Sequence, residues 1–95
     1  MYISNLLGKR NLNELVIKSI LWNSIIEIFR KNKNFNILPF LVSIKINNNI
    51  ILVKVSRPII KTEVMIEREN INNLFKSKIT KVYNNNNDFI IKYVV

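Results

Sequence analysis

The stretch that decides the fold is residues 44–75, IKINNNIILVKVSRPIIKTEVMIERENINNLF. It contains two short apolar runs separated by three asparagines, and a proline follows the second run closely. Asparagine tolerates the positive φ that a tight hairpin turn requires, and proline is favoured in the first turn of a helix. The stretch therefore predicts a β-hairpin followed directly by an amphipathic helix.

The alternation of side chains sets the expected register of this hairpin. We expect the first strand over residues 40–47 and the second over residues 50–56, with Asn48 and Asn49 as the turn. A slip by one residue would turn a whole apolar face toward water, so the register is strongly specified. The cross-strand neighbours on the inner face are then all apolar: Ile46 opposite Ile51, Ile44 opposite Val53, and Val42 opposite Val55.

The segment after the hairpin is typical of one helix over residues 58–76. Glu67 is expected to lie outside its apolar stripe, with the other charged residues. Residues 79–83 and 88–95 then read as strands on either side of the asparagine run 84–87, which a hairpin loop explains. The apolar residues of the helix recur at helical spacing, and they are Ile60, Val64, Ile71, Leu74 and Phe75.

The residues before the hairpin predict two helical segments. Residues 2–8 suit a short helical turn that stops at Gly8, and residues 12–29 suit a longer helix capped by Asn11 or Asn13. Trp22 lies in the apolar stripe of the longer helix. We expect it to anchor the core, so that its replacement by alanine would cost about 3–5 kcal/mol.

The resulting order is α-β-β-α-β, with room for a further C-terminal strand. It describes a single α+β domain over residues 1–95, in which one sheet is packed on one face by helices. Ninety-five residues leave no room for two separate cores.

The composition argues against catalysis. The chain has neither histidine nor cysteine, so the usual general base, metal ligand, thiol nucleophile and disulfide are missing. Glu63 and Glu67 stand four residues apart, but solvated helix charges are a more common role than a metal pair. No phosphate-binding loop pattern occurs. We therefore expect no enzyme activity, no metal, no cofactor and no small-molecule substrate.

The net charge of +9, from 15 Lys and Arg against 6 Asp and Glu, favours a polyanionic partner. An AT-rich genome also enriches lysine, so an ordinary solvated surface remains the alternative. Tyr2, Tyr83 and Tyr93 could stack on bases, or could simply pack against the fold. The candidate nucleic-acid-binding residues are Lys9, Arg10, Arg30, Lys31, Lys33, Lys54, Arg57 and Lys61.

No apolar run is long enough to span a bilayer, and residues 1–10 lack the order of a signal peptide. These observations predict a cytoplasmic protein with no membrane partner.

Several of these features together resemble the DciA family of bacterial replicative helicase loaders. The resemblance covers about residues 12–83. It begins with a tryptophan followed by aliphatics (residues 21–26) and a proline segment, Leu38-Pro39. A strand, a polar turn and a second strand ending Val53-Lys54-Val55-Ser56 come next. The last features are a helix that carries Thr62-Glu63-Val64 and is closed by residues 71–75, and a final strand over residues 79–82.

The folded domain of that family is KH-like but lacks the G-x-x-G loop that clamps nucleotides in true KH domains. The resemblance implies a DNA-replication accessory protein. Such a protein would bind single- or double-stranded DNA without sequence preference, and would bind a DnaB-type replicative helicase to assist its loading. Two alternatives stay open: a KH-like RNA-binding or ribosome-associated module, and an interaction domain that uses its sheet edge without nucleic acid.

Overall fold

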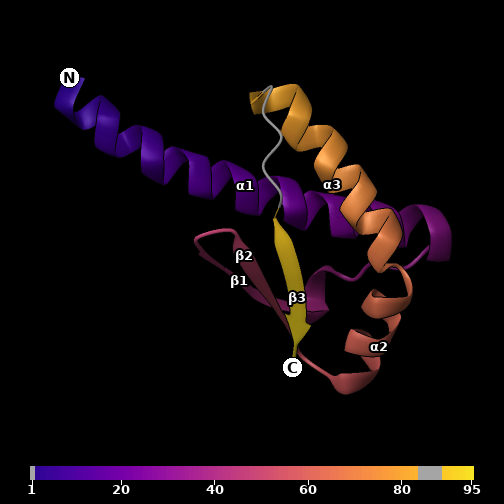
Figure 1. The fold of residues 1–95 in the computed structure, drawn as a ribbon. Helices are drawn as coiled ribbons and strands as arrows, with labels where there is room; N and C mark the ends of the chain where they lie inside the picture. Colours follow the sequence, from indigo (N-terminus) through magenta and orange to yellow (C-terminus); the bar gives the residue numbers. More distant parts are fainter. Residues whose placement is uncertain (1, 84–88) are drawn as a thin grey trace.

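The structure is a computed structural model that describes residues 2–83 and 89–95, with side chains described for 14–82 and 89–95. Its helices and strands form the small α+β fold, built on one sheet, that the sequence predicts (Figure 1). They are α1 (Tyr2–Lys33), a 3-10 turn (Leu38–Phe40), β1 (Leu41–Asn47), β2 (Ile50–Val55), α2 (Pro58–Ile66), α3 (Arg68–Tyr83) and β3 (Ile90–Val94).

The sheet has the strand order β1-β2-β3, with β2 in the centre. β2 is antiparallel to β1 and parallel to β3. A parallel pair needs a long crossover connection, which α2 and α3 supply. The predicted pairs Ile46–Ile51 and Ile44–Val53 are confirmed, and Asn48 takes the expected positive φ of 58° in the turn.

The predicted pairing of Val42 with Val55 is wrong, because β1 contains a bulge. Leu41 pairs with Val55 and Ser43 with Lys54, so one extra residue of β1 has no partner. A bulge of this kind changes which side chain points inward. Leu41 is consequently buried, at 8% exposed, whereas Val42 is 51% exposed.

The N-terminal segment forms one long helix rather than two. The α1 backbone is helical from Tyr2 through Gly8, so the predicted stop at Gly8 and the cap at Asn11 or Asn13 are wrong. A glycine inside a helix costs only about 1 kcal/mol, and the residues around it continue the helix. The helix ends at Lys33, because Asn34 adopts a left-handed φ of 49° and the Phe35 N–H donates to the Phe29 carbonyl (3.2 Å).

The predicted helix over residues 58–76 is interrupted at Glu67, which separates α2 from α3. The predicted strand over residues 79–83 is also wrong, since these residues form the last turns of α3. Ile79 continues the four-residue spacing of Ile71 and Phe75, and all three are buried. The strand expected over residues 88–95 is present as β3, and the expected loop over 84–87 lies outside the described residues.

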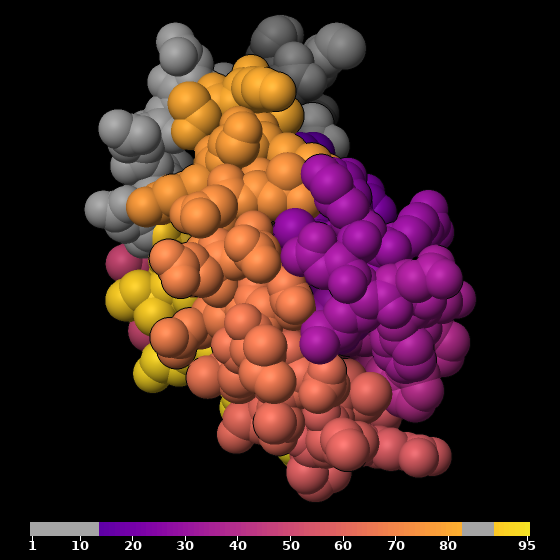
Figure 2. Space-filling model, turned by 90° about the vertical axis from the view of Figure 1, so that its right-hand side faces the viewer, coloured from indigo at the N-terminus to yellow at the C-terminus, as the bar shows by residue number. Residues whose placement is uncertain are grey.

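The described helices cover one face of the sheet. Figure 2 shows α1, α2 and α3 side by side on this face, with strand residues visible only at the margin. Trp22 and Ile26 are only partly buried, so Trp22 lies at the edge of the core rather than anchoring it. The completely buried core side chains are Leu21, Ile25, Ile37, Ile51, Val53, Val55, Val64 and Ile71.

Within the part of the chain that the structure describes, no helix combines the length and the apolar character that crossing a membrane requires.

Candidate nucleic-acid interface

The structure divides the candidate basic residues into two groups. Arg30, Lys31 and Lys33 lie in the last turn of α1, which we call the α1-end group. Lys54, Arg57 and Lys61 lie where β2 ends and α2 begins, which we call the β2–α2 corner. Lys9 and Arg10 belong to the first half of α1, and their side chains lie outside the described residues.

The β2–α2 corner includes the start of a helix. Arg57 occupies the N-cap position with an extended backbone (φ −143°, ψ 148°), and no side chain caps the helix. The first turn of α2 carries no acidic residue, and Pro58 has no N–H to offer. The partial positive charge of the helix N-terminus therefore adds to the charges of Arg57 and Lys61. Lys54 and Arg57 are exposed and Lys61 is half-buried, so the corner can accept a phosphate group.

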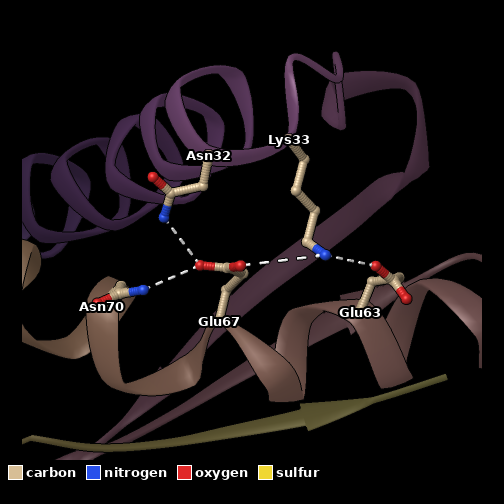
Figure 3. A network of polar contacts seen from close by, with 5 residues as sticks. All are labelled: Asn32, Lys33, Glu63, Glu67 and Asn70. Carbon is tan, nitrogen blue, oxygen red and sulfur yellow. Dashed lines mark hydrogen bonds and ion pairs between the residues drawn. The ribbon is translucent and has the colours of Figure 1, made fainter.

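The α1-end group is partly neutralised. The Lys33 ammonium lies 2.8 Å from Oε1 of Glu63 and 4.0 Å from Oε2 of Glu67 (Figure 3). The hydrogen bond to Glu63 raises the pKa of Lys33 above its ordinary value. Arg30 and Lys31 remain exposed, and they form no ion pair within the described part of the chain. Lys33 therefore contributes less to anion binding than its two neighbours.

Glu67 is buried, at 9% exposed, which corrects the expectation that it lies outside the buried stripe. The break between α2 and α3 turns its carboxylate toward the end of α1. There Oε1 accepts hydrogen bonds from Nδ2 of Asn70 and Nδ2 of Asn32, both 3.0 Å long (Figure 3). These hydrogen bonds lower the pKa of Glu67 below its ordinary value. The carboxylate thus fastens the α2–α3 junction to α1.

Glu63 and Glu67 share one lysine in this network. Among the described residues no group of three or more His, Cys, Asp or Glu side chains could hold a metal ion. In the described fold the two glutamates pair with Lys33, and Glu67 also accepts hydrogen bonds from Asn32 and Asn70.

The aromatic residues available for stacking differ from those expected. Tyr93 is only 5% exposed, and its burial raises the pKa of the phenol. The side chains of Tyr2 and Tyr83 lie outside the described residues. Phe35 is instead 39% exposed and stacks on Phe40, with ring centroids 5.6 Å apart. Its position in the polar segment after α1 was the only sequence signal for this exposure.

Trp22 has a second environment that the sequence did not predict. It lines an open groove of about 280 Å³ between α1 and β1, together with Lys18, Ser19, Asn23 and Ile44. The groove accounts for the partial exposure of the indole.

Comparisons of this chain with protein-family models, with curated proteins and with solved structures found no match. The chemistry of the site must therefore be inferred from its own residues.

Proposed function

We propose that this protein is a non-enzymatic DNA-replication accessory protein of the cytoplasm. It binds single- or double-stranded DNA without sequence preference, and it binds a DnaB-type replicative helicase to assist its loading. The β2–α2 corner carries the DNA-binding part of this proposal: Lys54, Arg57 and Lys61 lie within eight residues of one another, next to a helix N-terminus that no side chain caps.

The corner favours phosphate over any base-specific contact. Its groups are ammonium and guanidinium, which recognise phosphate oxygens. The backbone N–H groups of Ile60 and Lys61 already donate to the Arg57 carbonyl, so the side chains supply the contacts. Within the described chain no carboxylate forms an ion pair with these three residues. A net charge of +9 adds a long-range attraction to any polyanion. Binding of this kind tracks the nucleic-acid backbone and does not read sequence.

The remaining features of the resemblance to the DciA family support the helicase part of the proposal, although the strand that it implied over residues 79–82 is helical. The α2–α3 junction is compatible with a KH-like domain that has lost its nucleotide-clamping loop. The junction is Ile66-Glu67-Arg68, without glycine, and it holds a buried carboxylate that would repel phosphate. This same feature argues against the RNA-binding alternative.

Assistance without a nucleotide-hydrolysing site must come from binding energy. The domain would have to prefer one conformation of the helicase ring, because a ligand shifts an equilibrium only by its differential affinity. The β2–α2 corner would meanwhile hold DNA near the ring and raise its effective concentration.

The DNA part is tested by titrating the protein into fluorescently labelled single-stranded and duplex oligonucleotides at several salt concentrations. The double variant Arg57→Gln/Lys61→Gln should bind more weakly. It should also flatten the slope of log affinity against log salt by about 0.7–0.9 per lost phosphate contact. Arg68→Gln/Lys81→Gln, at two exposed positions on α3, removes the same two charges and should bind like the wild type. A slope that stays unchanged in the double variant would contradict the assignment.

The helicase part is tested by mixing the purified protein with the DnaB-type helicase of the same organism. Complex formation at micromolar concentration, together with faster loading of the helicase on single-stranded DNA, is the expected result. Absence of a complex, combined with tighter binding of RNA than of DNA, would favour the KH-like RNA module instead.

A further inference from the structure

The face of the sheet that points away from the helices has a defined composition. Ile51, Val53 and Val55 are completely buried against the helices, so the alternate residues of β2 point to the opposite side. Figure 1 shows α2, α3 and the C-terminal half of α1 on one side of the sheet only. We call the other side the open sheet face. Its residues, placed by the register, are Ser43, Lys45, Asn47, Ile50, Leu52, Lys54, Ile90, Lys92 and Val94.

Leu52 is the centre of this face. In the register it lies between Lys45 of β1 and Lys92 of β3, and Lys54 is its next neighbour on the same face of β2. Ile50 stands on the remaining side, with Ile90 beside it. Ile50 is 37% exposed and Ile90 is 50% exposed. The open sheet face is therefore an apolar strip bordered by three lysines.

The charges on this face are all of one sign. None of its nine residues is acidic, and within the described chain none of its lysines forms an ion pair. Neighbouring strands lie about 5 Å apart, so the three ammonium groups repel one another unless a partner brings carboxylates. The exposed isoleucines favour a partner that also removes them from water.

The face matches one kind of occupant. Three strands give a width of about 10 Å, which is the diameter of one α-helix with its side chains. A helix with an apolar stripe flanked by glutamate or aspartate would cover Leu52 and place its carboxylates near the lysines. Uncovered sheet faces are commonly buried against a helix in small α+β folds.

Other occupants fit less well. The face has no aromatic residue, so bases would find no stacking platform there. A second copy of the chain, placed face to face, would bring its own three lysines against these three, and like charges oppose such a pairing. We propose that the open sheet face is a docking surface for an acidic amphipathic helix of a partner protein. The open sheet face shares Lys54 with the β2–α2 corner, but the proposal does not require that the corner binds DNA.

The test uses the full chain and a synthetic helical peptide of about 18 residues, five turns, with a leucine stripe flanked by glutamates. The control peptide has the glutamates replaced by glutamine. Titration of the ¹⁵N-labelled protein should shift the amide signals of β1, β2 and β3 with the acidic peptide, and should shift them far less with the control peptide. The affinity expected is in the micromolar range, which is typical of a small interface.

Variants separate the open sheet face from general charge attraction. Lys45→Glu/Lys92→Glu should weaken binding of the acidic peptide by about tenfold or more, and Leu52→Asp should do the same. Arg68→Glu/Lys81→Glu, at two exposed positions on α3, makes the same change of charge as the lysine pair and should weaken binding far less. Circular dichroism of each variant verifies that the fold is kept; if Leu52→Asp unfolds, the lysine pair decides.

Four outcomes would overturn the proposal. The first is an equal loss of binding in Arg68→Glu/Lys81→Glu, and the second is no binding of the acidic peptide up to about 1 mM. The third is a set of amide shifts confined to the helices. The fourth is occupation of the same face by an oligonucleotide, by a second copy or by vesicles of anionic phospholipid.

Discussion

Glu67 shows how a single carboxylate can fix the relation between three helices. It holds the end of α1 through Asn32 and the start of α3 through Asn70, and it lies at the end of α2. Glu67 is buried at the break between α2 and α3. The sequence did not predict this break, because no glycine or proline lies there.

Replacing Glu67 with glutamine should lower the free energy of unfolding at neutral pH by about 1–3 kcal/mol. The glutamine oxygen can still accept from Asn32 and Asn70, but these hydrogen bonds are then neutral and weaker, and the attraction to Lys33 is lost. The pKa of Glu67 is lowered in the folded state. The stabilisation by the ionised Glu67 carboxylate is therefore complete above pH 4.5, its pKa in the unfolded chain. It is lost as the pH falls through the lower pKa of the folded state. Urea unfolding at neutral and at acidic pH should show the difference from wild type shrinking in acid. Glu69→Gln, exposed on α3, should show no such loss.

Trp22 and Phe29 are aromatic residues of α1 that differ in burial, so the cost of replacing each with alanine can be compared. Phe29 is 1% exposed, so Phe29→Ala should cost about 3–5 kcal/mol of unfolding free energy. Trp22 lines an open groove, and Trp22→Ala should cost clearly less, about 2 kcal/mol, despite the larger side chain removed. Chemical denaturation of both variants decides this order. A larger loss for Trp22 would mean that the indole is the core anchor that the sequence first suggested.

At the scale of elements, the hairpin was the most predictable part of the chain. Alternating apolar residues around an asparagine turn specify strand limits and most of the register without help from the rest of the fold. The bulge at Val42 was not predictable, since both Leu41 and Val42 are apolar and suit a strand. The choice between them depends on how β1 fits the helices above it.

The bulge makes a direct prediction. Leu41→Ala should lower the free energy of unfolding by about 2–5 kcal/mol, because Leu41 is buried in the core. Val42→Ala should change it by only about 0.5 kcal/mol, because Val42 is exposed. Thermal or urea unfolding of the two variants distinguishes the bulged strand from the regular register. Comparable losses at both positions would contradict the bulge.

The helices were predictable in kind but not in extent. The expected stop at Gly8 was wrong because the low helix propensity of one glycine was outweighed by the residues around it, which continue the helix. The residues of the last turns of α3 contain Ile79 and Val82, which favour a strand by propensity. The four-residue spacing with Ile71 and Phe75 carries more information, and it predicts the helix that is present.

At the scale of the whole molecule, basic residues are spread over different elements, and their structural roles differ. Lys33 and Lys78 pair with glutamates and stabilise contacts between helices, whereas the β2–α2 corner and the open sheet face present free cations within the described chain. Sequence alone cannot separate these roles, because each depends on which carboxylates the fold brings close. The candidate residues were therefore predictable as a set, but not as separate surfaces.

This separation gives a prediction for the protein as a whole. Arg57→Gln/Lys61→Gln should weaken oligonucleotide binding more than binding of the acidic peptide, and Lys45→Gln/Lys92→Gln, which removes the same two charges, should do the reverse. The reason is that the two pairs lie on different surfaces, so their effects should be independent. Lys54 belongs to both surfaces and is left unchanged in both variants. Titrations of each variant with both ligands measure this; parallel losses would indicate one shared surface.

The parallel pairing of β3 with β2 sets the order in which the molecule can be completed during synthesis. The β1–β2 hairpin can close once Val55 has left the ribosome, but the other edge of β2 waits for Ile90, about 35 residues later. At typical translation rates that interval lasts about 2–7 s. Throughout it the central strand offers an unpaired, strongly apolar edge to other nascent chains. Chaperone protection during those seconds should therefore matter more for this protein than its small size suggests.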